Sequence, residues 1–271
     1  MTDPMTPSPL VYLHCGFHKT GTTSLQALLA RNLGHMPEGS MSLVHSHPLV
    51  RQFGTAAKAY DRKPSKTTTA GLIAAWARLL AEVRAHGAGR VIISTENTFG
   101  RIPTIRRGTV TPYPRAGEIL SLLNSVSDGI ELRPIVYVRE DDAWTASLHR
   151  HLVRTRAFSL SLASFQSAFV GFEAGLLGIA HRISREAGTA VEILSFERDL
   201  PHRLGIGSSL LALAGLSDES LAPWQPVPRR NEGASDDLVR FVTTPPIANL
   251  PRPLRYASLR IRAKVKGSRL A

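Results

Sequence analysis

Residues 11–24 constrain the fold more than any other stretch of the chain, because a strand, a loop and a helix start follow one another there. The apolar run 11–15 predicts a buried strand, Gly16 and Gly21 bound a tight loop, and Thr22 opens an amphipathic helix. Backbone N–H groups in such a loop point inward, and the positive end of the helix dipole adds to them. The segment therefore predicts a binding site for an anionic group.

The loop has the glycine spacing of a nucleotide-binding P-loop but lacks the P-loop lysine. A P-loop carries a lysine directly after its second glycine, followed by a hydroxyl that holds magnesium. Here Thr22 follows Gly21, and the only lysine, Lys19, lies inside the loop. One cation in that place can neutralise a negative oxygen without recruiting a metal, and we expect no metal site. The alternative interpretation is a glycine turn that merely joins strand to helix.

A second candidate anion site follows a later strand. Arg139 comes directly after the apolar run 134–138. Ser147 lies about two turns into the helix that Asp141 opens. A guanidinium gives a bidentate fork and a hydroxyl gives a third bond, so this pair can hold one phosphate from two sides. A salt bridge from Arg139 to Asp141 or Asp142 is the alternative.

Both segments resemble those of the sulfotransferases that use 3′-phosphoadenylyl sulfate (PAPS). Residues 19–23, Lys-Thr-Gly-Thr-Thr, resemble the 5′-phosphosulfate-binding loop of that family, and the Arg139/Ser147 pair resembles its 3′-phosphate-binding segment. The resemblance implies a P-loop NTPase-like sulfotransferase fold, PAPS as the donor and adenosine 3′,5′-bisphosphate as the product. The cofactor-binding residues that it implies are Gly16, Phe17, Lys19, Thr20, Gly21, Thr22, Thr23, Ser24, Arg139, Ser147, Arg229 and Arg230.

Two further segments carry the resemblance. Residues 196–200, Phe-Glu-Arg-Asp-Leu, are similar to a turn after a late strand of the family's sheet. Residues 229–233, Arg-Arg-Asn-Glu-Gly, resemble the basic loop that closes over the nucleotide. Hormone-type members have a tryptophan after the two threonines, where this chain has Ser24. That difference points to the carbohydrate-type or bacterial branch.

Sulfuryl transfer to a hydroxyl requires that the leaving oxygen be neutralised and that the acceptor lose its proton. Lys19 is the candidate for the first task. Glu96, which follows the predicted strand 91–94, is the preferred base, because family members acting on glycans often have a glutamate in a comparable place. His18 is the alternative base, and a helix cap or an arginine pair is the structural interpretation of Glu96. We expect a saccharide or glycan acceptor, with other small hydroxyl compounds still open.

Apolar runs alternate with helical patterns, which predicts an α/β fold of three layers with a mostly parallel central sheet. The expected strands are 11–15, 91–94, 134–138 and 191–196. The expected helices begin at Thr22 and then cover 71–86, 118–126, 141–152, 158–187 and 206–214. Residues 34–70 predict a surface loop. Ligands of parallel sheets bind beyond the carboxyl ends of the strands, so Lys19, Glu96 and Arg139 should converge on one rim.

Composition limits the partners. The chain has 33 Lys and Arg against 21 Asp and Glu, a net charge of +12, which favours phosphate-rich cofactors, acidic glycans or anionic lipid. Only 6% of its residues are aromatic, so nucleic acid is the least supported partner. The single cysteine, Cys15, predicts a buried thiol and a reducing compartment. Without a secretory signal or a long apolar run, we expect a cytoplasmic protein.

We expect a disordered N-terminus over residues 1–9, one domain over 10–240 and a basic tail over 241–271. Residues 251–271 carry Arg and Lys but no acidic side chain. A disordered tail is the expectation there, and a reversible contact with anionic lipid at the inner membrane face is the alternative.

Two other functions stay open. A metal-dependent nucleotide kinase or NTPase would need a lysine after Gly21 and an acidic magnesium ligand, for which Glu96 is the only candidate. A non-catalytic nucleotide-binding protein would keep the anion loop alone. The presence of candidate catalytic residues beside the loop argues against that possibility.

Overall fold

The computed structural model describes residues 8–228 and 234–265, which belong to two compact units. The segments of the first unit fall within 1–102, 113–139 and 174–229, and those of the second within 103–112, 140–173 and 230–271. The expected division of the chain at residue 240 stays a prediction. Among the described residues, no helix is both long enough and apolar enough to cross a membrane.

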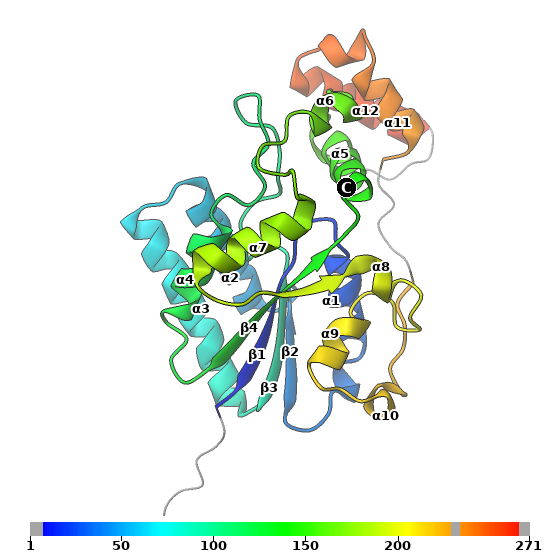
Figure 1. The fold of residues 1–271 in the computed structure, drawn as a ribbon. Coiled ribbons are helices and arrows are strands. Elements are labelled where there is room, and N and C mark those ends of the chain that lie inside the picture. Colours follow the sequence, from blue (N-terminus) through cyan, green and yellow to red (C-terminus); the bar gives the residue numbers. More distant parts are fainter. Residues whose placement is uncertain (1–7, 229–233, 266–271) are drawn as a thin grey trace, which may run out of the picture. The chain divides into compact units, whose positions relative to one another are not determined.

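The first unit contains a five-stranded, all-parallel sheet (Figure 1). Its strands, in the spatial order β2-β3-β1-β4-β5, are β1 (Leu10–Cys15), β2 (Ser40–Val44), β3 (Arg90–Thr95), β4 (Glu131–Val138) and β5 (Glu192–Ser195). Its helices are α1 (Thr22–Arg31), α2 (Pro48–Arg62), α3 (Lys66–His86), α4 (Ala116–Asn124), α7 (Gly175–Ala187), α8 (Phe196–Asp199), α9 (Ser208–Leu213) and α10 (Asp218–Leu221), with a 3-10 turn η1 (Leu33–His35). The predicted α/β class and parallel sheet are confirmed.

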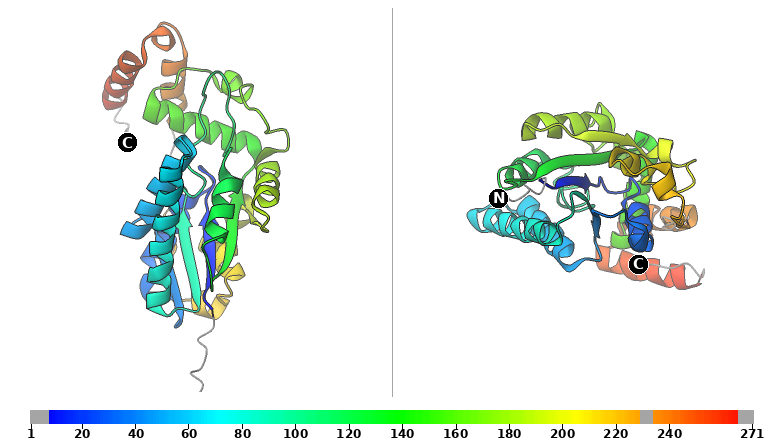
Figure 2. Two further views of the ribbon diagram at one scale, coloured as in Figure 1. Left: turned by 90° about the vertical axis from the view of Figure 1, so that its left-hand side faces the viewer. Right: turned by 90° about the horizontal axis from the view of Figure 1, so that it is seen from below.

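Helices cover both faces of this sheet. Helices α1, α9 and α10 lie on one face and α2, α3, α4 and α7 on the other, as the views in Figures 1 and 2 show. Successive side chains of a strand point to opposite faces, so Val11 and Leu13 of β1 face one layer and Tyr12 the other. Strands buried on both faces explain why the sequence shows continuous apolar runs rather than alternation.

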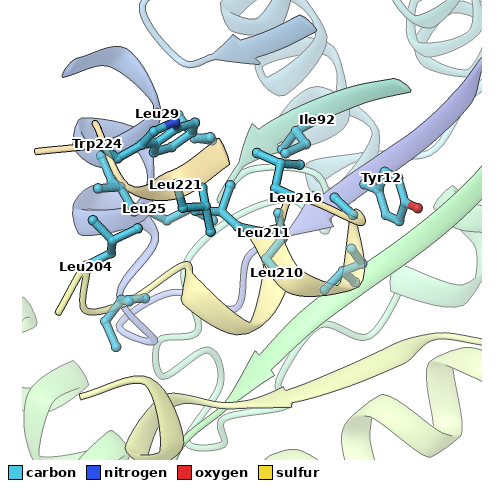
Figure 3. Close-up of a cluster of buried hydrophobic side chains, with 14 of the residues drawn as sticks. Tyr12, Leu25, Leu29, Ile92, Leu204, Leu210, Leu211, Leu216, Leu221 and Trp224 are labelled. Atoms are coloured by element: carbon cyan, nitrogen blue, oxygen red, sulfur yellow. The ribbon is translucent and has the colours of Figure 1, made fainter. Parts of the chain in front are cut away.

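An apolar cluster fixes α1 against the sheet, and with it the loop that precedes α1 (Figure 3). Leu25 and Leu29 of α1 pack with Leu210 and Leu211 of α9, and all four are fully buried. Trp224 completes the cluster, and its indole N–H donates to the carbonyl of His35 at 3.2 Å. Burial of such side chains contributes about 1.5–3 kcal/mol each, so the start of α1 has a stable position.

The sequence predicts a surface loop over residues 34–70, and this prediction is wrong. The stretch contains β2 and α2, and α3 begins within it. Its glycines and prolines are misleading because several lie at element ends. Pro48 occupies the first turn of α2, where no intrahelical donor is needed. Gly54 lies inside α2, where a Cβ atom would come within 3.1 Å of Asn97 Cβ.

The regular secondary-structure elements in the described part of the second unit are all helices. The unit contains α5 (Asp141–Arg156), α6 (Leu162–Gln166), α11 (Asp236–Thr243), a 3-10 turn η2 (Ile247–Asn249) and α12 (Arg252–Val265). The prediction of one helix over 158–187 is wrong, because α6 ends at Gln166 and α7 begins only at Gly175. Disorder over 251–271 is also wrong for residues 252–265. They form α12, whose Leu259 and Ala263 are buried in a cluster with α5 and α11.

Candidate functional site

The loop between β1 and α1 begins where the strand order of the sheet changes direction. Strand β1 lies between β3 and β4, and the chain continues from it to β2 on one side before it reaches β4 on the other. Ligands of open parallel sheets bind outside the carboxyl ends of the strands at such a point. The predicted cofactor-binding run lies here, with residues 16–21 in the loop and 22–24 in the first turn of α1.

Two residues with positive φ shape the loop. Lys19 has φ 70° and Gly21, the N-cap of α1, has φ 91°. A Cβ atom on Gly21 would lie 2.8 Å from Ile206 Cγ2, so glycine is required there for space as well as for conformation. Thr20 closes the turn, because its Oγ1 donates to the carbonyl of Phe17 at 2.6 Å. Both Thr20 and Phe17 are fully buried and form the base of the loop.

Thr22 carries a buried hydroxyl with no hydrogen-bond partner among the described residues. Its side chain is 3% exposed, and a methyl group on Gly16 would overlap its Oγ1. The hydroxyl can therefore occupy this place only because residue 16 lacks a side chain. The first hydrogen bond of α1 runs from Ser24 N to Gly21 O at 2.9 Å, so the N–H groups that precede it have no intrahelical acceptor. Such a set of donors fits phosphate oxygens.

Arg139 lies at this loop, as the sequence predicts. It follows β4, and its Nη1 donates to the carbonyl oxygen of Lys19 at 3.3 Å. Its Cζ lies 4.7 Å from the ring centroid of Phe196, a cation–π contact. Phe196 itself packs against the loop, since its Cε2 would be 3.1 Å from a Cβ atom on Gly21. The structure thus brings Arg139 to the backbone of Lys19 at this edge of the sheet.

Asp199 explains how the segment that carries Phe196 keeps its position. Its buried carboxylate accepts hydrogen bonds from Tyr137 Oη at 2.7 Å, Gly207 N at 2.8 Å and Ser209 N at 3.1 Å. These bonds join β4, α8 and the start of α9. Burial, the charge of Asp199 and the hydrogen bond to it all raise the pKa of Tyr137, so the phenol stays a donor. The turn predicted over 196–200 is the short helix α8.

Glu96 directly follows β3, whereas Arg139 follows β4. These two strands flank β1 on opposite sides. The side chain of Glu96 is half-buried. Its carboxylate makes no hydrogen bond and no ion pair with any residue that the structure describes. Neither of the structural interpretations, a helix cap or an arginine pair, is seen in that part of the chain. A half-buried carboxylate without a partner is a chemically suitable proton acceptor.

Tyr113 connects the loop with the surroundings of Glu96, and sequence reasoning missed it. Its hydroxyl accepts a hydrogen bond from His18 N at 2.7 Å and lies 3.2 Å from His18 Nδ1. Its ring is 1% exposed and stacks on Phe17, with 4.9 Å between the ring centroids. Burial raises the pKa of Tyr113, and the charge of Glu96 raises it further, so the phenol is neutral at pH 7. Tyr113 lies in a stretch rich in proline and arginine that shows no periodic signal.

His18, the alternative base, is 6% exposed. Its ring is nearly parallel to that of Tyr113, with 6.0 Å between the centroids and 11° between the planes. Its backbone N–H and its Nδ1 both contact the same phenol, and these contacts limit its movement. The arrangement favours a role in positioning the loop over one in proton removal.

A buried histidine, His14, lies next to the start of the loop, and it was not among the predicted site residues. His14 Nδ1 is 2.9 Å from Ser94 Oγ, and its Nε2 has no hydrogen-bond partner among the described residues. Its Cε1 would be 3.1 Å from a Cβ atom on Gly16, so its ring lies against the start of the loop. Burial lowers the pKa of His14 to about 3, and the ring is neutral at pH 7. The sequence signal that could have identified it is a histidine near the end of the apolar run 11–15.

Ser147 is half-buried on α5, in the second unit, whereas Arg139 belongs to the first. A phosphate site shared by this pair stays a prediction. Arg229 and Arg230 lie outside the described residues.

No model of a known protein family matches the chain, and the sequence of no curated protein matches it.

Proposed function

We propose that the protein is a sulfotransferase that transfers a sulfuryl group from PAPS to a hydroxyl group, with a saccharide or glycan as the preferred acceptor class. The observation that carries this proposal is the hydrogen bond from Arg139 to the carbonyl of Lys19. It puts a guanidinium beside a loop that already contains an ammonium group and the start of α1. Two cationic side chains at one anion loop suit a donor that is phosphorylated at both the 5′ and 3′ positions.

The residues of the loop fit a 5′-phosphosulfate group. The Thr22 hydroxyl, buried and without a partner in the described part of the chain, supplies one donor, and the first N–H groups of α1 supply others. PAPS supplies an activated sulfuryl group when bound. The ammonium of Lys19 would neutralise the negative charge that develops on the leaving phosphate oxygen.

Glu96 would take the proton of the acceptor hydroxyl. It is half-buried directly after the carboxyl end of β3, and the buried residues Asn97 and Thr98 follow it in the chain. A carboxylate can act as general base when the acceptor hydroxyl lies within hydrogen-bond distance of it. Tyr113 would position the loop through His18 rather than act on the substrate.

Thermal unfolding with added nucleotides tests the proposal. Adenosine 3′,5′-bisphosphate at about one hundred times its Kd should stabilise the protein by about 2.7 kcal/mol, which raises Tm by several degrees. ATP with magnesium at the same concentration should have a smaller effect. Stabilisation by ATP with magnesium alone would instead favour the kinase or NTPase alternative.

Transfer of radiolabelled sulfate from PAPS to a panel of acceptors then tests catalysis. The panel should contain oligosaccharides, a lipid-linked glycan, a tyrosine peptide and a simple phenol. Labelling of any of these identifies the acceptor class. Binding of the bisphosphate with no labelling across the panel, and no hydrolysis of PAPS, would favour a non-catalytic nucleotide-binding protein.

A further inference from the structure

Helix α12 presents a stripe of apolar side chains to solvent. Leu254, Ile261 and Val265 are 55%, 67% and 79% exposed, and the last two are the most exposed large hydrophobic residues in the described chain. With Ser258 they follow the spacing i, i+4, i+7 and i+11, which places all four on one side of a helix. A stripe of this kind in contact with water is unfavourable and usually marks an interaction surface.

The opposite side of α12 is fixed within the second unit. Leu259 and Ala263 are buried in a cluster with Val153 of α5 and with Leu238 and Val242 of α11. Because this side of the helix is already packed, the apolar stripe faces away from the core of its unit. Turning the stripe inward would expose the buried residues.

Basic side chains flank the stripe on both sides. On one side lie Arg260 and Lys264, which are exposed and form no hydrogen bond or ion pair with the described residues. On the other side lie Arg255, which donates to the carbonyl of Ala248 at 3.2 Å, and Arg262, which pairs with Asp237 at 3.3 Å. Helix α12 contains no acidic residue. Apolar residues between two rows of cations match the boundary between acyl chains and anionic headgroups.

We propose that α12 binds the surface of an anionic lipid bilayer, with Leu254, Ile261 and Val265 inserted and with Arg260 and Lys264 on the headgroups. The helix has 14 residues, about 21 Å, so it lies in the plane of the interface and does not span the bilayer. A second copy of the chain is a poorer occupant, because a symmetric contact through the stripe would bring the same cations together. This proposal does not depend on the sulfotransferase function.

Vesicle co-sedimentation of the full chain tests the proposal. The protein should sediment with vesicles of 70% phosphatidylcholine and 30% phosphatidylglycerol, but not with phosphatidylcholine alone. Half-molar salt should release it. Arg260→Gln with Lys264→Gln should weaken partitioning roughly 20-fold, since each basic residue near an anionic surface contributes about fivefold. Ile261→Ser should weaken it roughly tenfold.

Matched controls separate this surface from general charge and apolarity. Lys66→Gln with Arg78→Gln removes the same charge from α3, and Leu177→Ser removes an exposed apolar side chain from α7. Neither control should change partitioning by more than twofold, and unchanged circular dichroism spectra should show that all variants fold.

Three outcomes would overturn the proposal. The first is no sedimentation with the anionic vesicles. The second is sedimentation that the α12 variants leave unchanged. The third is a dimer in sedimentation velocity that Ile261→Ser dissociates, without any vesicle binding, which would assign the stripe to self-association.

Discussion

The Nη1 atom of Arg139 donates a hydrogen bond to the carbonyl oxygen of Lys19, and the Arg139 guanidinium stacks on Phe196. The first contact joins the end of β4 to the loop after β1, and the second joins it to α8, which follows β5. The cationic edge of the loop is thus built from the carboxyl ends of three strands. The position of Arg139 relative to the loop therefore depends on how the strands of the sheet pack, and not on the loop sequence alone.

Replacement of Arg139 should mainly weaken binding. Arg139→Ala removes a charged donor, and charged hydrogen bonds contribute about 1.5–3 kcal/mol, so the Kd for adenosine 3′,5′-bisphosphate should rise roughly 10- to 100-fold. Arg139→Lys keeps the positive charge but loses the bidentate geometry of the guanidinium. Its Kd should therefore lie between those of the parent chain and Arg139→Ala. Isothermal titration calorimetry measures both, with the exposed Arg198→Ala of α8 as a control that leaves Kd unchanged. Equal affinities for Arg139→Ala and the parent chain would remove Arg139 from the nucleotide site.

Loss of the Lys19 amine should mainly lower turnover. We expect Lys19→Ala to reduce kcat roughly 100- to 1000-fold, because charge on the leaving oxygen would no longer be neutralised, while the Kd for the bisphosphate changes less. Lys19→Gly is the control, since glycine adopts φ 70° without strain. If Lys19→Gly recovers parental turnover, the defect of Lys19→Ala lies in the backbone and the amine has no role in catalysis.

Glu96 should be required for proton removal. Glu96→Gln keeps the shape but cannot accept a proton, so kcat for sulfate transfer should fall roughly 100-fold or more, with little change in nucleotide affinity. Glu82→Gln, an exposed change on α3, is the matched control. An unimpaired Glu96→Gln enzyme would transfer the role to another residue.

A methyl group at position 16 should disturb the loop. Gly16→Ala would force Thr22 to move, which costs about 1–3 kcal/mol in the free energy of unfolding and reduces nucleotide binding. Thr22→Ala removes the overlapping hydroxyl. Urea unfolding of the double variant should therefore show a smaller cost of Gly16→Ala than in the parent chain. Additive costs would mean that the two residues do not compete for the same space.

His14 should make stability depend on pH in mildly acidic solution. Its folded-state pKa is lowered to about 3 by burial, whereas an unfolded histidine titrates near 6.5. Between these values the unfolded chain binds more protons, so stability falls as pH falls, by up to about 1.4 kcal/mol per pH unit for this residue. Urea unfolding at pH 4.5, 5.5 and 6.5 should show a shallower slope for His14→Gln. An identical slope in both proteins would contradict the assigned burial effect.

The parts of the site that depend on local sequence and on the parallel sheet could be predicted. The loop follows from glycine spacing beside an apolar run, and the convergence of Lys19 and Arg139 follows because parallel strands share one carboxyl edge. Tyr113 and Phe196 could not be predicted as loop contacts, because each reaches the loop from a segment far away in sequence. Only packing of the whole sheet brings those rings to His18 and Arg139.

Elements that lack a clear periodic pattern could not be predicted from the sequence either. Strand β2 and helix α2 lie in a stretch where proline and glycine suggest irregular structure, yet the tertiary contacts of residues such as Phe53 decide their conformation. In α12 the basic composition indicates a solvated tail. Two small buried contacts, at Leu259 and Ala263, are enough to dock it against α5 and α11.

The left-handed backbone of Lys19 has an energetic cost. Most side chains other than glycine, asparagine and aspartate are disfavoured in that conformation by about 1 kcal/mol or more. Glycine, asparagine or aspartate at this position would therefore be expected to give a more stable turn. Under the proposed function, Lys19 would exchange some of that stability for a positive charge in the loop, as functional residues often do.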